Sequence, residues 1–234
     1  MTRAKPTRAE TPPAVPSRKN ILIVDDHPFM RAGLAQLINR QPDMVVCGEA
    51  GDPAAAMAEL ARAKVDLVVT DLTMPGRSGL NFIKDVHAAN ATLAILVVSM
   101  HDEVIYAERA LRAGARGYIM KEAGGENLLA ALRQVLSGQI YVSAKMSARI
   151  LENLSSRRPR GSSSPIEKLT DREFEVFQLI GEGKSTREIA KQLHLSSKTV
   201  DVHRGHIKEK LGLGDVTALV RHAVRWVETQ NLDR

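Results

Sequence analysis

Five short, mostly apolar runs alternate with helical patterns between residues 21 and 137, and this alternation constrains the fold more than any other feature. Such runs are typical of strands that are covered on both faces. The segments between them place apolar residues three and four positions apart, which is the spacing of amphipathic helices. We predict strands at 21–24, 44–48, 66–70, 93–98 and 117–120, and helices at 29–40, 53–63, 79–89, 103–113 and 126–137.

This strand–helix order predicts a parallel, doubly wound α/β sheet with helices on both faces. The single cysteine, Cys47, falls within a predicted strand, and we expect it in the core. One cysteine can form neither a disulfide framework nor a thiolate metal cluster, which fits a reducing cytoplasm. No apolar stretch approaches the ~18 residues of a membrane span, and the N-terminus lacks the apolar centre of a signal peptide. We therefore expect a cytoplasmic protein with no membrane association.

Composition divides the chain into four parts. Residues 1–19 are rich in proline and polar side chains and are predicted to form a disordered arm, followed by the α/β domain at 20–140. Residues 141–165 end in SSRRPRGSSSP, a linker composition, and Met146, Ile150 and Leu154 are spaced for a short helix within 143–154. Residues 166–234 form a second domain.

The second domain is predicted to be all α, with four helices. Thr170 with Glu173, and Ser185 with Glu188, have the spacing of capping boxes at two helix starts. A third helix begins at Ser196, and a fourth covers about 215–227. The second and third helices are separated only by HLS, which is the spacing of a helix-turn-helix unit.

Charge in this domain is concentrated around the same unit. Residues 184–210 contain seven basic and three acidic side chains, within a chain whose net charge is +6. A local excess of positive charge suits the phosphate backbone of double-stranded DNA. Aromatic residues make up only 3% of the chain, which argues against recognition by base stacking. On the third helix, the surface opposite the apolar face would meet a major groove; it comprises Lys198, Val202, Gly205 and Glu209, flanked by Asp201 and Lys208.

Polar side chains follow the strands of the first domain at the points where the strands end. Asp25 and Asp26 end the first strand, Asp71 the third, Ser99 the fourth and Lys121 the fifth. Ligands of open parallel sheets bind at this edge. Three carboxylates converging there imply a hard cation, and Mg²⁺ prefers such ligands. We expect Asp71 to be a nucleophile towards phosphorus, with Lys121 and Ser99 contacting the other phosphoryl oxygens.

The segments VDDH, DLTMPGRSG, VVSMH and GYIMKE appear in order, and with them the first domain closely resembles the receiver domain of two-component response regulators. The resemblance implies a flavodoxin-like (βα)5 fold, with Asp71 as the acceptor of a phosphoryl group from a sensor histidine kinase. It also implies that the backbone carbonyl of Thr73 is a further metal ligand. Ser99 and Tyr118 would form a switch pair, in which Ser99 turns towards the phosphoryl group and Tyr118 packs inward.

Residues 169–212 resemble the LuxR-type helix-turn-helix, and together with the receiver resemblance this places the chain in the NarL/FixJ family. The resemblance implies base-reading positions at Asp201, Val202 and Gly205, and a dimer interface on the final helix. Phosphorylation is expected either to release a masked DNA-binding domain or to drive formation of a homodimer, and the sequence leaves both open. The phosphate-contacting candidates, from charge and resemblance together, are Lys184, Arg187, Lys198, Thr199, His203, Lys208 and Lys210. Because Gly205 has no side chain and Asp201 is only an acceptor, direct readout is expected to be sparse.

Three other functions compete with this one. A metal-dependent phosphohydrolase with an Asp nucleophile would need a second Asp two residues after it, where this chain has Thr73. A dinucleotide-binding oxidoreductase would need G-x-G-x-x-G after the first strand, which is absent. A regulator that works without phosphorylation would not need the full set of Asp, Lys and Ser, although only a phosphorylation assay decides this.

Overall fold

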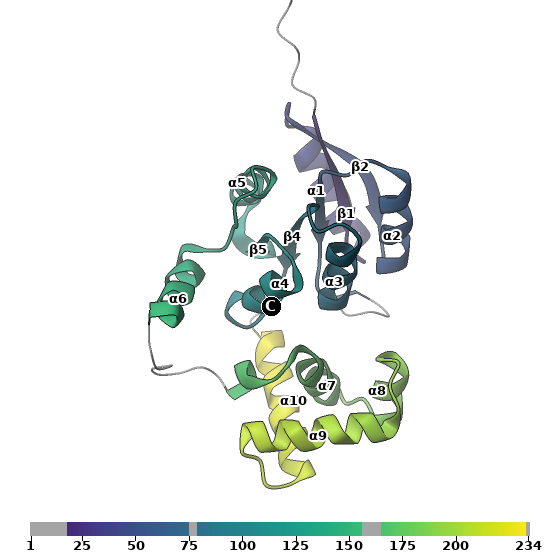
Figure 1. Cartoon of the computed structure of the whole chain (residues 1–234), viewed down its shortest axis with the longest axis vertical. Helices are drawn as coiled ribbons and strands as arrows, with labels where there is room; N and C mark the ends of the chain where they lie inside the picture. The colour runs from purple at the N-terminus through teal and green to yellow at the C-terminus, as the bar shows by residue number, and fades with distance from the viewer. Residues whose placement is uncertain (1–17, 75–78, 156–164, 233–234) are drawn as a thin grey trace, which may run out of the picture.

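The computed structural model describes residues 18–74, 79–155 and 165–232, and it forms two domains (Figure 1). The predicted arm therefore lies outside the described residues up to residue 17, as does most of SSRRPRGSSSP. Arg18 and Lys19 belong to the folded domain and not to the arm, because Lys19 begins the first strand and Arg18 Nε donates to Met44 O over 2.8 Å. No described helix has the length and apolar character needed to cross a membrane.

The first domain contains a five-stranded parallel sheet in the order β2-β1-β3-β4-β5. The predicted doubly wound α/β fold is confirmed. Chain order reverses between β1 and β3, so the carboxyl ends of these two strands flank the position where ligands bind in such sheets. The strands are β1 (Lys19–Val24), β2 (Met44–Ala50), β3 (Leu67–Thr70), β4 (Ala94–Ser99) and β5 (Gly117–Met120).

Helices cover both faces of the sheet and enclose two cores. On one face, α1 and α5 pack over alternate strand residues such as Ile23 and Val69. On the other, α2, α3 and α4 pack over the intervening residues such as Leu22 and Val68. Buried residues on both sides of every central strand explain why these runs lack polar side chains. The helices are α1 (Pro28–Asn39), α2 (Pro53–Arg62), α3 (Gly79–Ala89), α4 (Glu103–Ala113) and α5 (Gly125–Leu136).

The edge strand β2 differs from its prediction. It is half-exposed, with only Met44 and Ala50 buried, so the expectation of two covered faces is wrong for this strand. Its register against β1 shifts between Ile21 and Leu22, which leaves Cys47 as an extra residue in a bulge. Cys47 is consequently half-buried and not in the core as expected, with its thiol sulfur 3.4 Å from Ile21 O. Bulges are favoured at sheet edges because pairing is needed on one side only.

The segment after the sheet begins with the predicted short helix. It is α6 (Ala144–Ser155), which packs against α4 through the buried side chain of Met146. The Ser143 backbone N–H, just before this helix, donates to Glu103 Oε1 over 2.7 Å. The chain is described again from the short 3-10 helix Pro165–Lys168. Helix α6 thus packs on the first domain, and its Arg149 also pairs with Glu167 of this 3-10 helix over 2.6 Å.

The second domain is all α, as predicted. Its helices are α7 (Asp171–Gly181), α8 (Thr186–Gln192), α9 (Ser197–Leu211) and α10 (Val216–Leu232). Both predicted capping boxes are present, and Ser196 caps α9. Helix α10 is longer than predicted. Between α8 and α9, His194 adopts a left-handed conformation with φ of 53°, so the tight turn depends on a side chain in a conformation that L residues seldom adopt.

Candidate functional site

The carboxyl ends of the strands bring Asp25, Asp71 and Lys121 together. The Lys121 ammonium lies 2.7 Å from Asp25 Oδ2 and 2.7 Å from Asp71 Oδ2, although these residues are separated by 96 and 50 positions in the chain. All three side chains are at most 6% exposed. The sequence pattern predicted this convergence, and the strand order of the sheet produces it.

Asp71 is held at both carboxylate oxygens. Its Oδ1 accepts from the Leu72 N–H at 2.6 Å and from the Thr73 N–H at 3.3 Å, while Oδ2 accepts from Lys121. These donors are charged or fixed in the backbone, so they orient the carboxylate without side-chain rearrangement. Two oxygens restrained in this manner suit a carboxylate that must attack in one direction.

The acidic cluster fits a hard divalent cation. Ligand atoms of Asp25, Asp26, His27 and Asp71 all lie within 4.8 Å of one another. Asp26 Oδ1 is buried and has no hydrogen-bond partner among the described residues, although His27 Nδ1 lies at ion-pair distance, 2.8 Å. A buried carboxylate oxygen that accepts no hydrogen bond and lies beside two other carboxylates is a donor arrangement that Mg²⁺ would complete. His27, the residue before α1, is mostly exposed.

Lys121 is charged in this arrangement. Burial works to lower its pKa, but hydrogen bonds and charge interactions with Asp25 and Asp71 outweigh burial and raise the pKa. The ammonium therefore stays protonated at neutral pH and offsets part of the repulsion between the two carboxylates. A phosphoryl group bonded to Asp71 would lie next to this fixed positive charge.

Ser99 and Tyr118 lie behind the carboxylates on neighbouring strands. Ser99 is fully buried at the end of β4, and Tyr118 is fully buried on β5. The Tyr118 hydroxyl donates to His101 O over 2.7 Å. Burial raises the pKa of Tyr118 well above its ordinary value, so the phenol stays neutral. Tyr118 already packs inward here, and its proposed movement on phosphorylation stays a prediction.

His101 is a residue at this site that sequence analysis did not single out. Its Nε2 lies 2.6 Å from Thr73 Oγ1, and its ring stacks on Tyr106 with centroids 4.5 Å apart. Its backbone N–H also lies 3.4 Å from Ser99 Oγ. His101 thus contacts the loop after β3, the end of β4 and helix α4. His101 is part of the segment VVSMH, but the sequence pattern there does not distinguish it from an ordinary loop residue.

Helix α9 presents the predicted surface to solvent. Val200 and Ile207 are buried, while Lys198, Asp201 and Glu209 are exposed and Val202 is 48% exposed. A Cβ added at Gly205 would meet no atom within 4 Å, so this part of the helix is open. Thr199 is held at the helix start, where its N–H and hydroxyl both contact Ser196 Oγ. This surface combines a small apolar group, one acceptor and flanking lysines.

Of the predicted phosphate contacts, Lys210 is paired within the domain and His203 is uncharged. The Lys210 ammonium lies 2.6 Å from Glu173 Oε2 on α7. The His203 ring is half-buried, and burial together with the charge of Arg172 lowers its pKa, so the ring is neutral at pH 7. Lys184 and Arg187 are exposed and Lys208 is half-exposed. Arg204, part of the same basic run, donates to Thr186 Oγ1 over 2.7 Å and ties α9 to α8.

Comparison with known proteins places both domains in families. Residues 21–133 match the response regulator receiver domain, and residues 167–223 match the bacterial regulatory proteins of the luxR family. The oxygen regulatory protein NreC of Staphylococcus aureus (strain bovine RF122 / ET3-1) is 37% identical over 209 residues, covering 88% of this chain and 96% of NreC. The chain is a two-component response regulator of the NarL/FixJ family. It is not an enzyme of the classical kind.

Two solved structures resemble this response regulator over nearly their whole length. RcsB from Salmonella enterica serovar Typhimurium, bound to the promoter rprA in the presence of phosphomimetic BeF₃⁻, has a TM-score of 0.69 at 26% identity, covering 89% of this chain and 99% of RcsB. A structure of two RcsB dimers bound to two parallel DNAs has a TM-score of 0.67 at 26% identity, covering 88% and 99%.

Proposed function

We propose that this response regulator is a phosphorylation-controlled transcription factor, in which a sensor histidine kinase phosphorylates Asp71 and thereby changes how residues 166–234 bind double-stranded DNA in the cytoplasm. One observation supports the chemistry above all others: the buried Asp71 carboxylate is fixed by Lys121 and two backbone N–H groups beside Asp25 and Asp26. A nucleophile needs this orientation, and phosphoryl transfer needs positive charge beside the phosphoryl oxygens, where negative charge gathers.

Asp25, Asp26, Asp71 and the Thr73 carbonyl would hold Mg²⁺, which neutralises charge on the phosphoryl oxygens when bound. The Asp71 carboxylate attacks phosphorus, a P–O bond forms, and the P–N bond to the kinase histidine breaks with imidazole as the leaving group. Lys121 pairs with one phosphoryl oxygen, and Ser99 donates to another. The neutral Tyr118 stays behind Ser99 as part of the switch pair.

DNA binding is assigned to the exposed surface of α9. Val202, Asp201 and Gly205 would face base edges, while Lys184, Arg187, Lys198, Thr199 and Lys208 surround them as phosphate contacts. Lys210 and His203 would contribute less charge to DNA, because Lys210 is paired and His203 is neutral. Phosphorylation would favour a homodimer, since joining two weak DNA-binding domains makes the second half-site encounter intramolecular.

The test is phosphorylation of the full chain with Mg²⁺ and acetyl phosphate, followed by in vitro selection of DNA sites with and without the phosphodonor. Wild type and Asp43→Asn, an exposed aspartate paired with Arg133, are expected to be labelled equally. Asp71→Asn is expected to carry no label and to show no change in selected sites on phosphodonor addition. Label on Asp25 or Asp26, or identical DNA binding in both wild-type states, would overturn the proposal.

A further inference from the structure

Helix α4 of the receiver contacts helix α7 of the DNA-binding domain through a buried arginine. Arg109 is 7% exposed, and its guanidinium lies 3.2 Å from Asp171 Oδ1 and 3.1 Å from Ile166 O. The same group lies over the Phe174 ring, 4.4 Å from its centroid. A desolvated arginine needs such partners, and every one of these partners belongs to the other domain.

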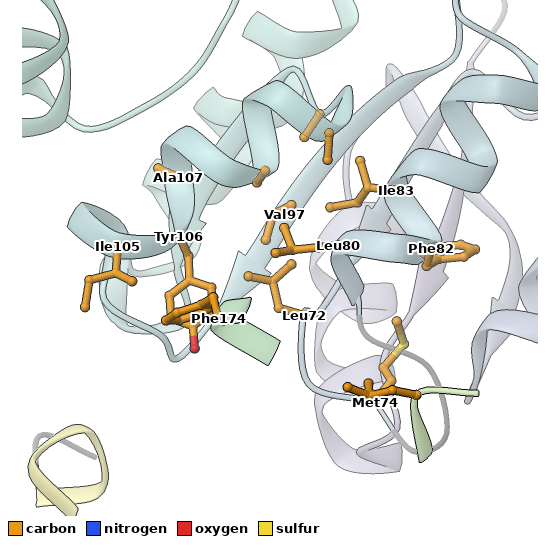
Figure 2. Packing of buried hydrophobic residues seen from close by; sticks show 14 of the residues in the cluster. Leu72, Met74, Leu80, Phe82, Ile83, Val97, Ile105, Tyr106, Ala107 and Phe174 are labelled. Atoms are coloured by element: carbon orange, nitrogen blue, oxygen red, sulfur yellow. The ribbon is translucent and has the colours of Figure 1, made fainter. Parts of the chain in front are cut away.

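Aromatic rings continue this contact into the core of the second domain. Tyr106, one turn before Arg109, meets Phe174 edge-on with centroids 5.2 Å apart (Figure 2). Phe174 in turn meets Trp226 of α10 at 5.5 Å. The Tyr106 hydroxyl accepts from Gln178 Nε2 at 2.6 Å. The contact is therefore specific in shape and in hydrogen bonding.

Polar pairs surround these rings. Lys84 Nζ lies 2.6 Å from Asp171 Oδ2, and Asn81 Nδ2 donates to Glu175 Oε1 over 2.9 Å. Both donors come from α3 of the receiver. Asp171 is thus paired with two receiver cations, which fixes the start of α7 against the α3–α4 surface. We call the residues that make these contacts between the domains the interdomain contact: Asn81, Lys84, Tyr106, Arg109, Ile166, Asp171, Phe174, Glu175 and Gln178.

The interdomain contact is joined to the phosphorylation site by His101. Its ring stacks on Tyr106 with an interplanar angle of 20°, and its Nε2 contacts Thr73 Oγ1. Ser99 Oγ is 3.4 Å from the His101 N–H, a long hydrogen bond. If Ser99 turns towards a phosphoryl group on Asp71, this bond lengthens further and the loop that holds the His101 ring is released. Tyr106 would then lose its stacking partner.

The recognition surface lies away from the interdomain contact. In Figure 1, α9 lies on the side of the second domain that is farthest from the sheet, while α7 lies between α9 and α4. Val202 and Lys198 are exposed although the two domains are in contact. The receiver therefore restrains the position of the DNA-binding domain without covering its DNA-facing helix.

From these contacts we infer that the α3–α4 surface of the receiver is a docking site for α7 of the same chain, with Arg109 and Tyr106 as its principal residues, and that phosphorylation releases α7 through His101. Docking opposes pairing of two DNA-binding domains across a two-fold site and leaves the affinity for one half-site unchanged. The inference rests on the proposed function of Asp71, because phosphorylation is the event that breaks the contact.

Trp226, the single tryptophan of the chain, provides a probe of docking in the full-length protein. Its indole packs on Phe174, whose ring is covered by Tyr106 and Arg109. Addition of Mg²⁺ and BeF₃⁻ to the wild type is expected to shift Trp226 emission to the red and to increase the radius of gyration in X-ray scattering. Arg109→Gln and Asp171→Asn are expected to show both changes without BeF₃⁻. The control is Arg112→Gln, an exposed arginine of α4 that pairs only locally with Glu108 and is expected to behave as wild type.

Linkage gives a second measurement on the same variants. If BeF₃⁻ binding weakens docking, loss of docking must tighten BeF₃⁻ binding by the same factor. Calorimetry is expected to show an increase in affinity of about fivefold or more for Arg109→Gln and Asp171→Asn, with the double variant no tighter than either single one. His101→Ala is expected to bind BeF₃⁻ with little further change in Trp226 emission. Equal affinity in wild type and both interface variants would overturn the inference.

DNA binding by these variants tests whether docking only restrains the DNA-binding domain or also covers its recognition surface. On a duplex with one half-site, the wild type without BeF₃⁻ and Arg109→Gln are expected to bind within about twofold of each other, whereas on a two-half-site duplex Arg109→Gln binds more tightly. A large gain on the single half-site would mean that the recognition surface is covered, and would overturn this part. Failure of the proposed function looks different: BeF₃⁻ would then bind wild type and Asp71→Asn alike. BeF₃⁻ binding that requires Asp71 but leaves emission and scattering unchanged would refute the docking inference alone.

Discussion

The ammonium of Lys121 lies 2.7 Å from a carboxylate oxygen of Asp71, within a site where both side chains are almost completely buried. The same ammonium contacts Asp25 at 2.7 Å, so one cation balances two carboxylates that approach each other from different strands. Loss of one partner of a buried ion pair leaves the other charge uncompensated, which costs far more than loss of a surface pair. This relationship determines how the receiver should respond to metal and to mutation.

Lys121→Met is expected to lower the free energy of unfolding of the metal-free receiver by about 3–5 kcal/mol, because Asp25 and Asp71 are left unpaired. Mg²⁺ should restore much of the loss, since it supplies positive charge to the same carboxylates. The variant should bind metal yet lose most of the response to phosphodonor. Urea unfolding with a metal chelator and with Mg²⁺ measures the free energy of unfolding in both states. Lys19→Met, which removes an exposed pair with Asp66, should cost at most about 1 kcal/mol. Equal costs for the two variants would contradict the assigned role of Lys121.

Lys198 and Lys210 should differ in their effect on DNA binding, although both belong to the basic run of the second domain. Lys198 is exposed on α9, and Lys198→Ala should weaken binding at all sequences and flatten the dependence of log K on log salt by about one unit. Lys210 is paired with Glu173, so Lys210→Ala should leave the salt slope nearly unchanged and reduce stability instead. Binding isotherms at several salt concentrations distinguish them. A decrease of one full unit in the salt slope of Lys210→Ala would show that Lys210 contacts a DNA phosphate.

Glu173 should make the second domain sensitive to acid. Burial works to raise its pKa, but hydrogen bonds from Lys210 and Thr170 outweigh it and hold the pKa below the ordinary value of 4.5. A depressed folded-state pKa contributes stability above the unfolded-state value, and this stability is lost as the pH falls through the folded value. Glu173→Gln should therefore cost about 1–3 kcal/mol at neutral pH and progressively less below about pH 4.5. Urea unfolding as a function of pH tests it; a cost independent of pH would show that the charge is not involved.

Two glycines of the second domain should respond oppositely to alanine. A Cβ at Gly181, the last residue of α7, would overlap a methyl of Val227 and lie 2.5 Å from Ala223 O, because α10 packs directly on this point. Gly181→Ala should destabilise the domain by about 1–3 kcal/mol.

Gly205→Ala should instead stabilise the domain by up to about 1 kcal/mol, because the position is open and alanine favours a helix. Thermal unfolding of both variants provides the measurement. Since the added methyl lies on the predicted base-reading surface, Gly205→Ala should also change which DNA sequence is preferred. Destabilisation by Gly205→Ala would mean that the α9 surface is packed against something in the free protein.

The fold and the cluster of carboxylates and lysine in the receiver could be predicted from the sequence because both depend on local patterns. The alternation of apolar runs and helical spacing is read within each segment, and parallel strands necessarily place their carboxyl ends on one edge. Asp25, Asp71 and Lys121 were predicted to converge on these grounds. The capping residues Thr170 and Ser185 were equally local, since a capping box spans only four positions.

Other features were decided only by tertiary structure. Cys47 lies outside the core because the register of β2 against β1 shifts at that position, and pairing register is not encoded in one strand alone. The basic run predicts Lys210 as a DNA contact, but only the fold shows that Glu173, 37 positions away, lies beside its ammonium. Arg109 lies 62 positions from Asp171, on a helix whose sequence pattern gave no sign that this face is covered. Local sequence sets backbone preferences and apolar faces. Which charge meets which depends on how distant segments pack, and in this chain that packing joins the receiver to the DNA-binding domain.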